Sequence, residues 1–240
     1  MSWTTRPASE AAGDIAAQIK GAGPVLVLVH GVGLCAEAWT KAGNELSASM
    51  EVHAVDMPGH GLSPLNDASS LGDFSNRIAQ YIENIRQPVR VAGHSMGAMI
   101  AIQLAARTSL DVTAVAALNA IYRRDPAAAR AVRARAADLP DDRASDPEIT
   151  LQRWFGALTQ TSLAPSADAC RRWLTQADPK GYKAAYTVFA HQDGPEDELL
   201  RGLSCPALFL TGGRDPNSTP AMSHAMADLC PDGAVDVLTD

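Results

Sequence analysis

One short segment, residues 93–97, has the residue types that nucleophilic catalysis requires. It reads G-H-S-M-G, a G-x-S-x-G pattern that follows an apolar run at 89–93 and precedes good helix formers at 98–106. A serine in a sharp turn between strand and helix projects above the carboxyl edge of a sheet, where the helix dipole favours developing negative charge. Flanking glycines remove side chains that would collide in that strained turn. We predict that Ser95 is the nucleophile; the alternative is a serine in an ordinary turn.

Two backbone N–H groups are candidates for binding the oxyanion that forms when a serine attacks a carbonyl. One belongs to Met96, which directly follows the nucleophile. The other belongs to Val32, in the glycine-flanked loop after the apolar run at 25–29. We predict that both donate to the oxyanion. His30, at the start of this loop, is expected to bond loop backbone and shape the turn rather than to act as the base.

A third loop, G-G-R-D at 212–215, follows the apolar run at 207–211. A carboxylate just past a strand end can orient an imidazole and stabilise its charged form. Asp215 is therefore the predicted catalytic carboxylate, and the order of serine before aspartate along the chain supports it. Two alternatives stand beside this assignment. Asp215 could cap a helix that starts near Pro220, or Asp125, just after the preceding strand, could take its role.

The three loops must be positioned by an alternation of strands and helices. The run at 25–29 is continuously apolar, as in strands buried on both faces of a parallel sheet. Residues 15–20 fit a first antiparallel strand or a short helix, and we favour the strand. The pattern predicts an α/β fold with a mostly parallel central sheet flanked by helices. We expect strands at 25–29, 51–56, 89–93, 112–118, 207–211 and 234–238, and helices at 74–85 and 96–107.

The alternation breaks at residues 122–195, which are helical and polar, with Asp-Pro pairs as turn signals. Because this stretch separates two sheet strands, we interpret it as an inserted helical cap on a core of residues 1–121 and 196–240. It holds seven of the twelve aromatic residues, which could line a pocket for an apolar or ring-bearing acyl group or could pack the cap helices together. These are Tyr122, Trp154, Phe155, Trp173, Tyr182, Tyr186 and Phe189.

Arginines gather near the start of the predicted cap. They could attract a substrate that carries a carboxylate or phosphate, although a solvated helix face is the favoured interpretation. The residues are Arg123, Arg124, Arg130, Arg133 and Arg135.

Four motifs, taken in order, resemble the α/β-hydrolase superfamily. They are V-L-V-H-G-V-G from Val27, V-D-M-P-G-H-G-L-S from Val55, G-H-S-M-G from Gly93 and G-G-R-D from Gly212. Within the superfamily the chain looks like small capped esterases, enol-lactonases and related hydrolases. The resemblance implies hydrolysis of a carboxylic ester, thioester or lactone through an acyl-enzyme, with no cofactor. Alternatives are an acyltransferase or C–C bond hydrolase with the same site, and a catalytically silent ligand-binding relative.

The catalytic histidine is the one departure from the family pattern. The family places it in a loop after the last strand, whereas all six histidines lie earlier in this chain. His191, in the cap, and His224 are outside the family position, so no base is named. We expect the base in about 20–30 further residues after Asp240, since a chain ending on its last strand exposes apolar sheet surface and an edge strand. The alternative is a non-catalytic relative.

Composition and charge limit the possible partners. The 46% hydrophobic and 20% charged residues are ordinary for a globular protein, and the net charge of −7 argues against nucleic acid or an anionic membrane as partner. No signal peptide or membrane-spanning run is evident. Four widely separated cysteines lack metal-ligand spacing. We expect a cytoplasmic protein with free thiols, no metal and a small-molecule acyl substrate.

Overall fold

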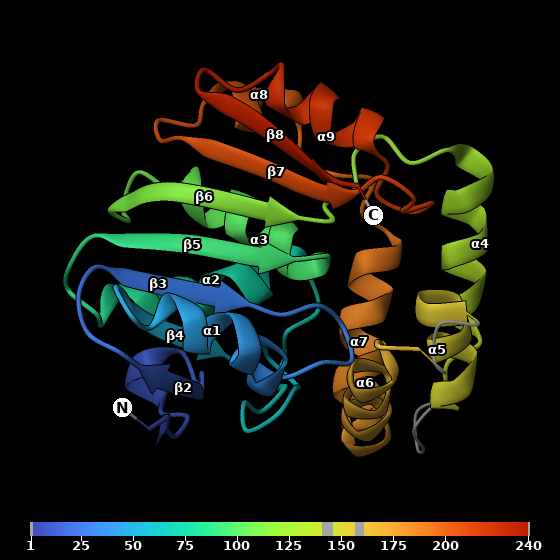
Figure 1. The fold of residues 1–240 in the computed structure, drawn as a ribbon, viewed down its shortest axis with the longest axis horizontal. Coiled ribbons are helices and arrows are strands. Elements are labelled where there is room, and N and C mark those ends of the chain that lie inside the picture. Colours follow the sequence, from blue (N-terminus) through green and yellow to red (C-terminus); the bar gives the residue numbers. More distant parts are fainter. Residues whose placement is uncertain (1, 141–145, 157–160, 240) are drawn as a thin grey trace.

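A central eight-stranded sheet organises the computed structural model, which describes residues 2–140, 146–156 and 161–239 (Figure 1). The strand order is β1-β2-β4-β3-β5-β6-β7-β8, parallel from β4 to β8 and antiparallel at β1–β2 and β2–β4. This confirms the predicted mostly parallel sheet. The strands are β1 (Thr4–Arg6), β2 (Ala17–Lys20), β3 (Val25–Val29), β4 (Glu51–Val55), β5 (Val89–His94), β6 (Val112–Leu118), β7 (Ala207–Gly212) and β8 (Gly233–Leu238).

The N-terminal edge of the sheet is antiparallel. β2 pairs with β4, so the strand favoured for residues 15–20 is confirmed. β1 pairs with β2 and was not anticipated, because its three residues, Thr4–Arg6, have no apolar pattern. Short polar strands of this kind form through the ladder that a neighbouring strand offers rather than through their own burial.

The sequence of the central strand β3 is continuously apolar because both faces of the strand are covered. All five of its residues are buried. Val25, Val27 and Val29 belong to the main core, whereas Leu26 and Leu28 belong to a smaller cluster on the opposite face. Side chains of a strand alternate between faces, so a strand covered on both sides must be apolar at every position.

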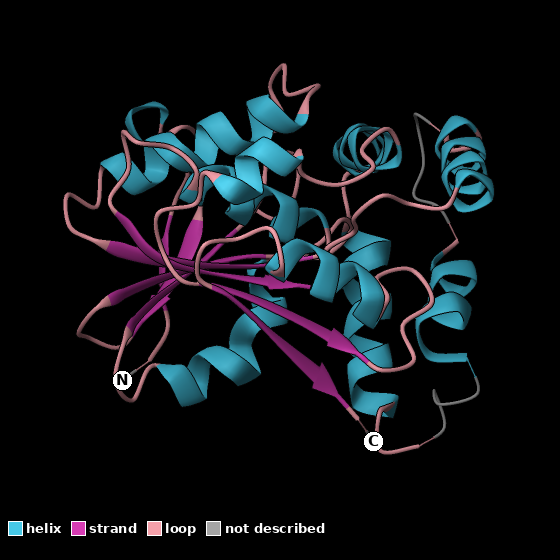
Figure 2. Ribbon diagram, turned by 90° about the horizontal axis from the view of Figure 1, so that it is seen from above, coloured by secondary structure: helices cyan, strands magenta, loops and turns pink. Residues whose placement is uncertain are grey.

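Helices cover the two faces unequally (Figures 1 and 2). α2 (Leu71–Glu83) and α3 (Met96–Ala105) pack together within the main core, and α9 (Pro220–Ala227) contributes Met226 to it. α1 (Thr40–Leu46), preceded by the 3-10 helix η2 (Ala36–Trp39), covers the opposite face; a second 3-10 helix, η1 (Glu10–Ala12), contacts α2. None of the described helices combines the length and apolar character needed to cross a bilayer.

In the described part of the chain, five helices follow one another between β6 and β7, and α4 to α7 lie beyond the carboxyl ends of the strands (Figure 1). Asp125, Asp146 and Asp178 each cap a helix whose first residue is proline, so these Asp-Pro pairs mark helix starts. Residues 141–145 and 157–160 of the predicted cap lie outside the described part. The helices are α4 (Pro126–Ala137), α5 (Pro147–Phe155), α6 (Ala164–Gln176), α7 (Pro179–Ala190) and α8 (Asp197–Arg201).

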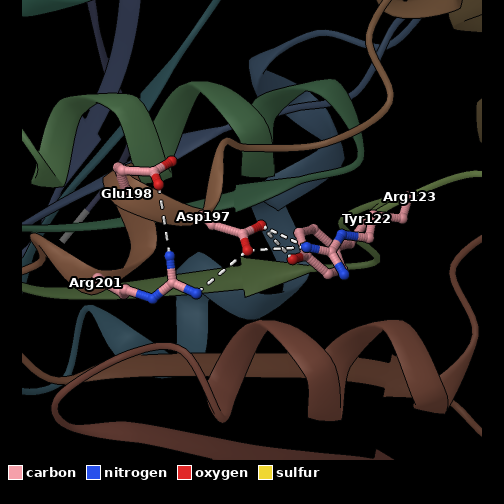
Figure 3. A network of polar contacts seen from close by, with 5 residues as sticks. All are labelled: Tyr122, Arg123, Asp197, Glu198 and Arg201. Atoms are coloured by element: carbon pink, nitrogen blue, oxygen red, sulfur yellow. Dashed lines mark hydrogen bonds and ion pairs between the residues drawn. The ribbon is translucent and has the colours of Figure 1, made fainter.

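The residues that follow β6 are bonded to the start of α8 (Figure 3). The Tyr122 hydroxyl donates a 2.6 Å hydrogen bond to Asp197, at the start of α8, and the Arg123 guanidinium lies 2.8 Å from the same carboxylate. Arg201 also contacts Asp197, and the Arg123 N–H donates to the carbonyl of Asp193. Asp197 therefore joins the residues just after β6 to those just before β7.

Candidate active site

Ser95 occupies the junction of β5 and α3 in a strained conformation, with φ 57° and ψ −119°. Its N–H donates a 2.8 Å hydrogen bond to the Leu118 carbonyl, which ties the turn to β6. A Cβ on Gly93 would collide with the carbonyl oxygen of Gly97, and a Cβ on Gly97 would collide with that of Val29. The turn therefore has the strand–turn–helix geometry expected from the motif, and both glycines are sterically required. The nucleophilic role of Ser95 stays a prediction.

The loop after β3 passes directly against this turn. A Cβ on Gly31 would lie 3.2 Å from Ser95 Cβ and 3.0 Å from His94 Nδ1. Among the described residues no acceptor is found for the Val32 N–H, and Met96 is the first residue of α3, where N–H groups have no intrahelical acceptor. The structure thus brings the loop that contains Val32 alongside Ser95 and Met96. It leaves both predicted donors available.

Two buried histidines hold this loop in place. The His30 ring bonds the Gly31 carbonyl through Nδ1 (2.7 Å) and accepts the Met57 N–H at Nε2 (2.9 Å). His60 Nε2 accepts the Gly33 N–H at 3.1 Å. Burial lowers the pKa of His30 to about 4 and that of His60 to about 3, so both rings are neutral at pH 7. The expectation that His30 shapes the turn is confirmed, and its nitrogens are occupied.

Asp215 is fixed through both of its carboxylate oxygens. Oδ2 accepts a 2.7 Å hydrogen bond from Asn119 Nδ2, and Oδ1 accepts the N–H groups of Asn217 (2.8 Å) and Ser218 (3.0 Å). The charge of Asp215 also acts on His94, whose pKa burial lowers and Asp215 raises. Asp215 therefore lies at the same sheet edge as Ser95, in a loop that orients its carboxylate.

The helix caps show which aspartates have a capping role. α9 is capped by the Thr219 hydroxyl, which accepts the Met222 N–H at 3.4 Å, so Asp215 orders its own loop and does not cap this helix. Asp125 accepts the N–H groups of Ala127 and Ala128 as the cap of α4. Asp125 is therefore the cap of α4, and the catalytic role of Asp215 stays a prediction.

Asn119 is a site residue that sequence reasoning missed. It directly follows β6 in the left-handed region, with φ 52°, and its N–H donates to the Leu210 carbonyl of β7. The available signal was its place: a polar residue just past the end of a parallel strand, on the edge that presents Ser95 and Asp215. The role of His60 as acceptor for the Gly33 N–H was also missed, because it depends on contact with a segment distant in sequence.

The remaining histidines are engaged or exposed. His53, within β4, contacts Tyr81 and Glu51 at 2.8 Å each. His191 is exposed at the end of α7 and bonds the Thr187 carbonyl, and His224 is exposed in α9. We assign the base to none of the six histidines. No group of three or more possible metal-ligating side chains occurs in the part of the chain that the structure describes.

A cavity of about 910 Å³ opens beside the loop that follows β4. It is bounded by His60 and Asp56 of that loop, by Cys35, and by Trp173 and Asp178 near the junction of α6 and α7. Asp56 itself accepts the N–H groups of Ala36 and Leu62, so it is a loop-ordering residue. The cavity therefore adjoins the His60 support of the site rather than Ser95.

These features define a class of protein. The model of the α/β hydrolase family matches residues 26–240, so the chain belongs to that family and is a hydrolase. It is 38% identical over 221 residues to (E)-2-((N-methylformamido)methylene)succinate hydrolase of Acinetobacter baylyi, covering 91% of this chain and 83% of the relative. It is 30% identical over 225 residues to pimeloyl-[acyl-carrier protein] methyl ester esterase of Vibrio cholerae, covering 89% and 85%. The enol-lactonase from Burkholderia xenovorans LB400 superposes with a TM-score of 0.81 at 22% identity, covering 93% and 87%.

Proposed function

We propose that this hydrolase cleaves a carboxylic ester, thioester or lactone through an acyl-enzyme on Ser95. The observation that carries the proposal is the strained backbone of Ser95, at φ 57° between β5 and α3, with Gly31 packed against it. Strain of this kind persists at sites where geometry serves function. The loop that contains Val32 and the first turn of α3 supply two backbone donors beside the same hydroxyl.

In the proposed reaction the Ser95 hydroxyl oxygen bonds to the substrate carbonyl carbon, and the N–H groups of Val32 and Met96 stabilise the oxyanion. Collapse expels the alcohol, thiol or enol, which takes up the proton removed from Ser95. Water then attacks the acyl carbon, the bond between this carbon and the Ser95 oxygen breaks, and a proton from the water returns to that oxygen as the acid is released. Asp215, already held by Asn119, orients the base and stabilises its charged form.

The substrate class is supported by the relatives and by charge. One of the two relatives is named as a methyl ester esterase, and the more similar one is named as the hydrolase of a substituted succinate. We propose a small acyl compound as the partner, held under a cap of residues 122–195, rather than nucleic acid or a membrane, since the net charge is −7. The four cysteines are free thiols, which fits a cytoplasmic protein.

Substitution of the two proposed catalytic side chains tests the mechanism. With 4-nitrophenyl esters, Ser95→Ala should lower kcat by at least about 1000-fold, and Asp215→Asn by a similar factor, with unchanged circular dichroism. Asp125→Asn is the matched control, because it removes the same charge from a helix cap, and it should retain activity. Full turnover by Ser95→Ala, or loss of activity in Asp125→Asn alone, would refute the assignment.

A further inference from the structure

Two arginines of the cap helices meet at one tyrosine hydroxyl. Arg135 of α4 donates through Nε to the Tyr186 hydroxyl of α7 at 3.2 Å. Arg153 of α5 donates to Thr150 Oγ1 at 3.0 Å, and its positive charge also acts on the Tyr186 hydroxyl. Burial alone would raise the pKa of Tyr186, but the hydrogen bond from Arg135 and the positive charges of the two arginines lower it. Three helices therefore converge on a positively charged point.

Among the described residues, no carboxylate lies at this point, whereas neighbouring arginines have one. In the described part of the chain, the hydrogen bonds of Arg135 and Arg153 go to hydroxyl groups, and neither side chain forms an ion pair there. Two like charges at one hydroxyl repel each other, and a bidentate carboxylate is the group that guanidinium geometry matches best. The neighbours with carboxylate partners are Arg123 (Asp197), Arg124 and Arg133 (Asp193), Arg171 (Glu148) and Arg172 (Glu37).

The cluster adjoins the proposed oxyanion loop. Tyr186 stacks on Tyr182, with ring centroids 5.8 Å apart. A Cβ on Gly33 would lie 2.7 Å from Tyr182 Cε2, and Val32 packs against the apolar cluster that contains both tyrosines. Tyr182 and Tyr186 thus lie between the arginines and the loop that presents Val32 to Ser95.

We propose that Arg135 and Arg153, with the Tyr186 hydroxyl between them, form the subsite that binds a carboxylate of the acyl substrate. This rests on the proposed function and deepens it, because it defines the substrate as an acid derivative with a second, free carboxylate. Arg135 and Arg153 are both exposed residues, so an anion can reach them without a rearrangement of the core. The competing explanation is structural: the arginines fasten α4 and α5 to α7.

Paired substrates separate the two explanations. 4-Nitrophenyl hemisuccinate and 4-nitrophenyl butanoate share a leaving group and differ in the free carboxylate. We expect Arg135→Gln and Arg153→Gln each to lower the ratio of kcat/KM for the hemisuccinate to that for the butanoate by roughly tenfold to a hundredfold, mainly through KM. Arg→Lys at either position should restore part of the ratio. Arg130→Gln removes a charge from the same helix, α4, and should leave the ratio as in the wild type.

A direct binding measurement makes the result independent of turnover. Calorimetry with succinate should show binding to the Ser95→Ala protein and at least tenfold weaker binding when Arg135→Gln is added. Equal loss of both ester activities, an unchanged ratio, or unchanged succinate affinity would overturn the subsite. If the wild type hydrolyses neither ester but succinate binding depends on the two arginines, the subsite stands and the acyl-enzyme proposal fails.

Discussion

The side-chain amide of Asn119 donates a 2.7 Å hydrogen bond to Oδ2 of Asp215, across the gap between the ends of β6 and β7. Oδ1 of the same carboxylate is occupied by two backbone N–H groups of its own loop. The orientation of Asp215 is therefore set jointly by its loop and by a residue 96 positions earlier in the chain. Asn119 is a positioning residue for the proposed catalytic carboxylate.

Replacing Asn119 should impair catalysis through Asp215. Asn119→Ala removes one charge-assisted hydrogen bond, so we expect kcat to fall about tenfold with little change in KM. The matched control is Asn66→Ala, which breaks a similar 2.8 Å bond to Asp14 on the surface. Ester hydrolysis by the two variants, at equal folded fraction, checks this. Equal activity of Asn119→Ala and the control would show that Asn119 has no positioning role.

The glycines of the turn should differ sharply from a nearby glycine in their tolerance of a methyl group. Gly93→Ala forces a Cβ into the Gly97 carbonyl, whereas a Cβ on Gly212 would meet no described atom within 4 Å. We expect Gly93→Ala to lower the free energy of unfolding by about 3 kcal/mol or more, and Gly212→Ala to change it by less than about 0.5 kcal/mol. Urea denaturation measures both. Similar midpoints for the two variants would contradict the packing argument.

Acid should destabilise the fold through the two loop histidines. Burial lowers the pKa of His30 to about 4 and that of His60 to about 3, from an ordinary value of about 6.5. Between these values the unfolded chain binds protons that the folded protein does not, so the free energy of unfolding should fall as the pH drops from about 6.5 towards 3. Above about pH 7 both histidines are neutral in the folded and the unfolded protein, so they add no pH dependence to the free energy of unfolding.

The variant His60→Gln isolates this effect, because its amide oxygen can still accept the Gly33 N–H. Urea denaturation at several pH values should show a shallower fall of stability for His60→Gln than for the wild type. Burial raises the pKa of Asp56, which acts in the opposite direction. Identical slopes would mean that His60 is not the titrating group.

The contacts of Asp197 should hold residues 122–125 and 191–197 together (Figure 3). Asp197→Asn weakens the contacts to Tyr122, Arg123 and Arg201, so we expect faster amide hydrogen exchange in residues 122–125 and 191–197 and little change elsewhere. Glu198→Gln, on the same helix, loses only a 3.6 Å contact to Arg201 and is the control. Amide exchange that is equally fast in both variants would show that Asp197 does not hold these two segments together.

The sheet strands could be predicted from sequence because their signals are local. The six expected strands all occur, since continuous apolar runs such as 25–29 must be buried on both faces of the sheet. The strand–turn–helix context of Ser95 was equally readable, because the glycines at 93 and 97 have one steric reason to be there.

What sequence could not supply are contacts between distant segments. His60 meets the Gly33 N–H only after β3 and β4 pair, and Asn119 meets Asp215 only once β6 lies beside β7. The convergence of Arg135 and Arg153 on Tyr186 likewise depends on the packing of three helices. Composition showed an arginine-rich start of the cap and favoured a solvated face, without indicating which arginines lack a carboxylate.

Intact-mass spectrometry of the protein after treatment with a fluorophosphonate probe tests directly whether Ser95 is the nucleophile. We expect a single adduct, located by peptide mapping on Ser95 and absent from Ser95→Ala, while the Asp125→Asn control is labelled as fast as the wild type. An adduct on another residue, or equal labelling of Ser95→Ala, would contradict the assignment of Ser95 as the nucleophile.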